Sequence, residues 1–446
     1  MPVAYDLVII GGAPEGRTAA IAAATTGARV ALVEPPGAWQ QSHQLAALQQ
    51  ALRHSIGWAQ LPTWVTLKAT ITASARSAAA IAALGVDVIT GEAQFLAGNR
   101  PQLQVPHRCL SARAYLLATG PIRPPIEGQT LSPAQLLQLT QPPQTVALLG
   151  ARAAEIEWAF ALSAANIQVR LLAERCLPAE DTDIQRLLRH QLMAVGVVLN
   201  PIDKLEKIKS LDQQTQLWIE GTPTSVDHLL SLPNHRAWVA QLDLAAVGLS
   251  LDRGRLKVNR WLQTAHPRIY AVGALLGGED RPVLAELEAQ AAVQNALFWR
   301  RRRLTYRAVT YGLQGLSEVG RAGLSEQQAR SRYGSDRLQI VSASALPPAN
   351  SQYAVNFCKL ISLDSHQIIG MHLMGNGAIG LAAALGLSLR QRRLTVTSLA
   401  EQPAAPQTLA ALVQQTASQL QQRRWQVGQW QRDWAENWFN WRRSRR

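Results

Sequence analysis

Cysteine is scarce in this chain of 446 residues, and its scarcity excludes two classes of site. The three cysteines, Cys109, Cys176 and Cys358, are odd in number and lie far apart in the sequence. They can supply neither a disulfide framework nor a cysteine-rich zinc site. The sequence therefore predicts no metal centre and indicates a reducing, cytoplasmic compartment.

Long apolar runs are absent as well. The longest weakly polar stretch, near residues 378–389, is too short to span a bilayer, and no basic segment precedes an apolar one at the N-terminus. We therefore expect neither a transmembrane helix nor a secretion signal. Hydrophobic residues make up 47% and charged residues 17% of the chain, which is typical of a folded protein, and the length suits two or three domains.

Lysine is scarce as well, because it supplies only six of the 44 basic side chains. Arginine supplies the others, and the net charge is +14. A guanidinium group binds two oxygens at once, so this excess favours phosphates, carboxylates or an anionic surface. Nucleic acid is not expected, because no recognised nucleic-acid module accompanies the charge.

A pattern of strand, glycine turn, helix and strand opens the chain. Apolar residues 6–10 lead into the turn at Gly11, and a second apolar run ends at Glu34. In a dinucleotide-binding unit the first glycine makes the turn, the second position must be small so that the backbone approaches the pyrophosphate, and the third glycine lets the helix pack closely. Ala13 and Gly16 meet the last two requirements, and Glu34 can accept the ribose hydroxyls. The pattern predicts a nucleotide site.

A second unit of the same kind begins at residues 145–150 and continues through a helix to residues 169–172. Arg152 and Glu155 stand where its second and third glycines belong. Arg152 would put a long side chain in the path of the pyrophosphate, and Glu155 would repel phosphate. We expect this unit to be structural.

Further segments, taken in order, resemble the pyridine nucleotide-disulfide oxidoreductases, the family of dihydrolipoamide dehydrogenase, glutathione reductase and mercuric reductase. The similar segments are residues 85–95, 116–120, 269–273, 282–285, 323–329, 359–361 and 369–372. The resemblance implies an α/β fold with two Rossmann-like dinucleotide-binding domains, one for FAD and one NAD-like, and a C-terminal α+β interface domain that forms a homodimer. The implied domains are 1–143 with 267–305 (FAD), 144–266 (NAD-like), 306–415 (interface) and 416–446 (a basic, tryptophan-rich helix).

The resemblance also implies the cofactor FAD, while Arg152 and Glu155 make NAD(P) binding by the second unit unexpected. The residues that it places at FAD are Gly11, Gly12, Ala13, Pro14, Gly16, Glu34, Ala93, Ala118, Thr119, Gly120, Gly273 and Ala274. Ala274 stands where the family has an aspartate that binds the ribityl chain. Loss of one charge-assisted hydrogen bond would weaken FAD binding roughly tenfold to a hundredfold.

Two further departures bear on chemistry. The family's redox-active cysteine pair has no counterpart, because no cysteine occurs between Glu34 and Trp58. Ala405 and Ala410 stand where the family has a catalytic histidine and its glutamate. We therefore predict no catalytic residue for disulfide reduction. Two interpretations remain, a flavin-only oxidoreductase or a non-catalytic dimeric scaffold.

The C-terminal segment lies beyond the resemblance. Trp430, Trp434 and Trp438 recur every four residues and Trp441 follows, which on a helix makes one aromatic stripe. Seven arginines from Arg423 to Arg446 face only two acids, Asp433 and Glu436, so the segment carries a net charge of +5. This composition suits a helix lying on an anionic membrane. An acidic protein partner and packing within the dimer are the alternatives.

Overall fold

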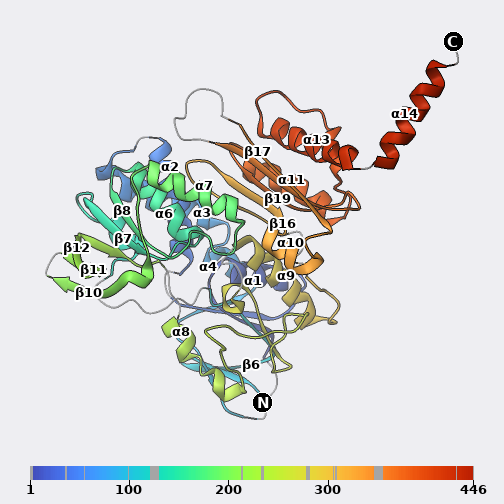
Figure 1. The fold of residues 1–446 in the computed structure, drawn as a ribbon. Coiled ribbons are helices and arrows are strands. Elements are labelled where there is room, and N and C mark those ends of the chain that lie inside the picture. The colour runs from blue at the N-terminus through green and yellow to red at the C-terminus, as the bar shows by residue number, and fades with distance from the viewer. Residues whose placement is uncertain are drawn as a thin grey trace. The chain divides into compact units, whose positions relative to one another are not determined.

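The computed structural model describes residues 4–35, 38–54, 56–98, 100–120, 130–211, 214–232, 236–277, 282–304, 306, 309–345, 355–427 and 429–444. The chain forms two compact units. The first comprises residues 1–177 and 195–304, and the second comprises residues 178–194 and 305–446. The predicted class, mixed α/β with parallel Rossmann-like sheets, is confirmed (Figure 1). The finer division into four domains stays a prediction.

A seven-stranded sheet forms the centre of the first unit, with strand order β3-β2-β1-β6-β5-β4 and β14 paired to β6. Its parallel strands β1, β2, β6 and β14 contain continuous buried apolar runs, as expected for strands covered on both faces, whereas β3 lies at the edge of the sheet and is less buried. The strands are β1 (Tyr5–Ile10), β2 (Val30–Glu34), β3 (Asp87–Thr90), β4 (Gln94–Leu96), β5 (Gln102–Val105), β6 (Arg108–Leu117) and β14 (Ile269–Ala271). The helices beside them are α1 (Pro14–Ala24), α2 (Ala38–Arg53), α3 (Leu61–Ser74), α4 (Ala78–Ala82) and α9 (Pro282–Leu297).

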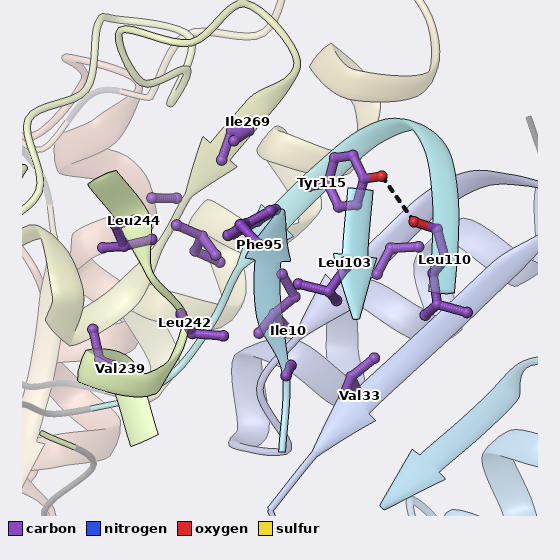
Figure 2. Packing of buried hydrophobic residues seen from close by; sticks show 14 of the residues in the cluster. Ile10, Val33, Phe95, Leu103, Leu110, Tyr115, Val239, Leu242, Leu244 and Ile269 are labelled. Carbon is purple, nitrogen blue, oxygen red and sulfur yellow. Dashed lines mark hydrogen bonds between the residues drawn. The ribbon is translucent and has the colours of Figure 1, made fainter. Parts of the chain in front are cut away.

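A buried apolar cluster supports one face of this sheet (Figure 2). Phe95 and Tyr115 meet edge to face in it, with ring centroids 5.6 Å apart. Figure 2 shows Val239, Leu242 and Leu244 approaching the sheet from a separate segment. The Tyr115 hydroxyl donates to the carbonyl of Pro101 at 2.7 Å, and burial raises its pKa to about 12. The strand ends that carry the glycine turn are therefore held by a packed core.

The rest of the first unit contains the second Rossmann-like sheet. It has four parallel strands in the order β13-β7-β8-β9, beside a three-stranded antiparallel sheet β10-β11-β12. The strands are β7 (Thr145–Leu149), β8 (Gln168–Leu172), β9 (Val198–Asn200), β10 (Leu205–Leu211), β11 (Gln214–Ile219), β12 (Thr222–Val226) and β13 (His228–Leu230). The helices are α5 (Pro133–Leu137), α6 (Ala153–Ala164) and α8 (Arg236–Gln241).

The second unit is built on a five-stranded antiparallel sheet with the order β15-β16-β19-β18-β17. Apolar residues of this sheet pack against the helices that follow it. The strands are β15 (Thr310–Leu313), β16 (Val319–Gly323), β17 (Leu338–Ala345), β18 (Asn356–Leu363) and β19 (Ile368–Met374). The helices are α7 (Thr182–Ala194), α10 (Glu326–Tyr333), α11 (Ala378–Arg390), α12 (Val396–Ala400), α13 (Leu409–Val427) and α14 (Gln429–Arg443). Among the helices described, none is long and apolar enough to cross a bilayer.

Candidate functional site: a dinucleotide cradle

The carboxyl ends of β1, β2, β6 and β14 meet at one edge of the large sheet, because these strands are parallel. Ligands of open α/β sheets bind at this edge. The turn at Gly11 follows β1, Glu34 ends β2, and Thr119 follows β6. Gly273 comes two residues after β14. The topology therefore brings segments that are distant in the sequence to one site. We call this site the cradle; it comprises the Gly11 turn, Glu34, Thr119 and Gly273.

The glycines of the first turn are required by close contacts. Gly11 has φ +133°, and a Cβ there would overlap the carbonyl oxygen of Ala118. A Cβ on Gly16 would overlap the carbonyl of Gly11, so the third glycine lets α1 approach the turn as the sequence predicted. A Cβ on Gly12 would overlap the Glu34 carboxylate, which therefore lies directly over the turn.

One hydroxyl in the cradle has no partner. Thr119 is 2% exposed, and its Oγ1 makes no hydrogen bond within the described part of the chain. A buried hydroxyl without a partner is costly, so such a group points to a ligand contact. The glycine turn and this hydroxyl together fit a dinucleotide.

Glu34 already has a charged partner, Arg17 on α1. The two side chains form an ion pair, and the residues are only 6% and 2% exposed. Burial raises the pKa of Glu34 although Arg17 opposes this, and burial lowers the pKa of Arg17 although Glu34 opposes this. The pair is therefore desolvated, and each charge depends on the other.

Other side chains hold Arg17 in place. The guanidinium carbon lies 5.0 Å from the centroid of the Trp39 ring, and Trp39 Nε1 donates to the carbonyl of Ala73 at 2.9 Å. His43 packs edge to face on Trp39 with centroids 4.4 Å apart. Burial, and after it the charges of Arg76 and Arg17, lower the pKa of His43. Trp39 therefore stacks on the guanidinium, and His43 supports the Trp39 ring.

A second acid, Glu15, lies at the N-terminal end of α1. It is 4% exposed, and its Oε1 lies 2.8 Å from the position that a Cβ on Gly273 would take. Glu288, which is 5% exposed, accepts the Gly273 N–H at 2.7 Å. Two buried carboxylates therefore flank Gly273, next to Ala274, where the resemblance expects an aspartate.

The structure brings most of the predicted cradle residues together, since contacts join Gly11, Gly12, Gly16 and Glu34 to the Ala118 segment. Ala13 caps α1 and Pro14 is its first residue. Ala93 lies in the apolar core, and its role at an adenine ring stays a prediction. The sequence analysis did not identify Glu15 or Arg17. Glu15 could have been identified, because an acid between the second and third positions of a glycine turn would repel the phosphates of a dinucleotide.

In the second Rossmann-like sheet of the first unit, the turn after β7 corresponds to the Gly11 turn and is occupied by the Glu155 side chain. Glu155 is 2% exposed, and its Oε2 accepts the backbone N–H of Arg152 at 3.1 Å. The carboxylate therefore caps the first turn of α6, at the helix N-terminus where a phosphate would bind. The Arg152 side chain is exposed.

A charge cluster lies inside the second unit. Lys359 is 2% exposed, and its Nζ donates to Asp181 and Asp183 at 2.8 Å each and lies 2.6 Å from Glu326. His372 is buried on β19, with Nδ1 2.6 Å from Glu180. The cluster ties α7 to the sheet.

The tail helix α14 carries an exposed aromatic stripe. Trp434 and Trp438 stack with centroids 5.8 Å apart, and Trp438 and Trp441 stack at 5.0 Å. These three residues are 63%, 42% and 44% exposed. Within the described residues the chain does not cover the stripe. The side chain of Trp430 lies outside the described residues.

Comparisons with known proteins agree with this geometry. A family model described as pyridine nucleotide-disulphide oxidoreductase matches residues 5–296. The chain is 26% identical to a mercuric reductase of Staphylococcus aureus, covering 91% of this chain and 80% of that protein. It is 25% identical to a dihydrolipoyl dehydrogenase of Chlorobaculum tepidum, covering 93% and 96%. The fold resembles the HOCl-induced flavoprotein disulfide reductase RclA of Escherichia coli, with a TM-score of 0.77, 23% identity and coverage of 93% and 99%.

Proposed function

Because the chain belongs to the pyridine nucleotide-disulphide oxidoreductase family, we propose that it is a flavoprotein that binds FAD but performs neither disulfide nor nicotinamide chemistry. The supporting observation is the cradle with the buried, unpartnered hydroxyl of Thr119. The backbone of the Gly11 turn and the N-terminal end of α1 would hold the pyrophosphate, and Glu34 would face the ribose. When bound, FAD supplies an isoalloxazine ring that exchanges electrons with a quinone, a protein carrier or another small acceptor.

The cysteines support the absence of disulfide chemistry. Thiol exchange needs a thiolate next to a second sulfur. Cys358 is fully buried, and burial raises its pKa to about 12. Cys109 is exposed on β6, and partial burial raises its pKa as well. Neither thiol is activated, and no pair has the family's spacing.

Glu155 supports the absence of nicotinamide chemistry. Its buried carboxylate at the N-terminal end of α6 would meet the pyrophosphate of NAD(P) with like charge. A bound dinucleotide would also have to displace the hydrogen bond from Arg152 N–H.

Absorption spectroscopy and FAD titration of the purified full chain test the proposal. We expect saturable uptake of FAD, no bleaching of the flavin by NADH or NADPH within seconds, and weaker uptake by Thr119→Val. Thr264→Val, which removes a buried hydroxyl bonded to the carbonyl of Ile269 at 2.8 Å, is the matched control. Failure of the wild-type chain to take up FAD, or rapid bleaching by NADPH, would contradict the proposal.

A second function is supported by α14, whose exposed stacked tryptophans and flanking arginines suit an anionic membrane. Each arginine near such a surface contributes about 1 kcal/mol, and the tryptophans add apolar burial that salt does not screen. We expect the full chain to sediment with anionic liposomes and a chain ending at Val427 to stay in solution. Equal sedimentation of the two chains would reject the membrane role. If the full chain binds an immobilised acidic protein but not the liposomes, the tail binds a protein partner instead. Homodimerisation stays a prediction.

A further inference from the structure

We infer that Arg17 and Glu15 compete with FAD for the cradle, so that FAD binds only by displacing contacts that the chain makes with itself. This inference rests on the proposed function, because it concerns the same site. It adds that two of the chain's own side chains control the affinity for the cofactor.

The first contact is the guanidinium of Arg17, which is hydrogen-bonded through all three of its nitrogens. Its Nη2 pairs with Glu34, its Nε donates to the carbonyl of Gly12 at 3.2 Å, and its Nη1 donates to the carbonyl of Arg76 at 2.7 Å. All three nitrogens therefore donate to acceptors inside the protein. The stacked Trp39 ring closes one face of the group. Arg17 is thus a buried, hydrogen-bonded part of the cradle and not an exposed surface cation.

The consequence falls on Glu34, the carboxylate that would accept the ribose hydroxyls. Its oxygen lies over Gly12 and is bonded to a cation. A ribose hydroxyl is neutral, so replacing Arg17 by it exchanges an ion pair for a hydrogen bond in which only the acceptor is charged. A displaced guanidinium would also need a new partner, because an unpaired buried charge is costly.

The second contact is Glu15 at the N-terminal end of α1. The helix dipole favours a negative group at this position, whether it is a carboxylate or a phosphate. Glu15 already supplies one, buried against Gly273, with Glu288 on the other side. Pyrophosphate would therefore approach like charge in a site of low dielectric. The site resembles that of α6, where Glu155 caps the helix.

Binding measurements on single variants test the inference, with flavin fluorescence and calorimetry as readouts that need no turnover. We expect Glu15→Ala and Arg17→Met each to bind FAD roughly tenfold to a hundredfold more tightly than the wild-type chain, the range of one charge-assisted hydrogen bond. Glu155→Gln, a change at the N-terminal end of α6 beside the second Rossmann-like sheet, should leave FAD affinity unchanged. Arg17→Met should also lower the melting temperature of the flavin-free protein, and added FAD should restore it in part. If Arg17→Met does not fold, the FAD affinity of Glu15→Ala tests the inference by itself.

The first two of the following three outcomes separate the inference from the proposed function. Tight binding by the wild-type chain with weaker binding by both variants would make these side chains FAD ligands, which overturns the inference and leaves the function standing. Binding by the variants alone would support the inference and overturn an FAD-dependent function. No binding by any protein would overturn both.

Discussion

Replacing Lys359 by methionine should destabilise the second unit severely. Lys359 is 2% exposed and faces three carboxylates, of which Asp181 is itself 2% exposed. Methionine fills a similar volume but removes the lysine charge bonded to that buried acid. Breaking a buried ion pair on one side costs about 3–5 kcal/mol of unfolding free energy. The structure therefore predicts a loss in this range.

Two exposed cations provide matched controls, because they pair with the same acids. Arg186 pairs with Asp183 and Arg330 pairs with Glu326, and their side chains are 67% and 45% exposed. Arg186→Gln and Arg330→Gln should each cost at most about 1 kcal/mol. Denaturant unfolding of the full chain measures all three variants, and hydrogen exchange on β18 assigns the loss to the second unit. A loss for Lys359→Met no larger than that of the controls would refute the reasoning.

The same cluster predicts a pH dependence. Burial would raise the pKa of Asp181, but His372 and Lys359 outweigh it and hold the pKa below its ordinary value. The stability that Asp181 contributes is therefore present above about pH 4 and is lost as the pH falls through its folded pKa. The difference between the wild-type chain and Lys359→Met should be largest near neutral pH and shrink below pH ~4. A constant difference across this range would exclude Asp181 as its source.

Three further predictions concern other parts of the chain. Gly16→Ala should destabilise the first unit by about 1–3 kcal/mol in thermal unfolding, because its Cβ would overlap the Gly11 carbonyl. Gly380→Ala, in helix α11 with open space at that position, should instead stabilise by up to about 1 kcal/mol, and a loss for both variants would contradict the overlap. In the folded protein at pH 8, mass spectrometry should find alkylation of the exposed Cys109 well before that of Cys358, whose pKa is about 12; equal rates would contradict the burial. Replacing Trp434, Trp438 and Trp441 by alanine should weaken liposome binding even at high salt, because salt does not screen apolar burial. The double variant Arg442→Gln with Arg443→Gln should weaken binding only at low salt. The same salt dependence for both variants would reject this division between apolar and charge contributions.

The sequence predicted the first β-α-β unit because its signals are local. Gly11, Gly16 and Glu34 lie within 24 residues, and the backbone alone brings them together. The Lys359 cluster could not be predicted in this way, since Asp181 and Lys359 lie 178 residues apart and meet only through packing. The effect of Glu15 could have been predicted from the sequence, because the like-charge repulsion that excludes phosphate at Glu155 applies equally to an acid in the first glycine turn.

The pairing of Arg17 with Glu34 has a consequence for how this chain can change over generations. Losing Arg17 alone leaves a buried carboxylate without its partner, and losing Glu34 alone leaves a buried guanidinium. Substitutions at the two positions are therefore epistatic, and their effects on stability should not add. A lineage that exchanges this pair one residue at a time must pass through a less stable intermediate. Selection for folding alone can thus preserve Glu34, whether or not the residue ever meets a nucleotide.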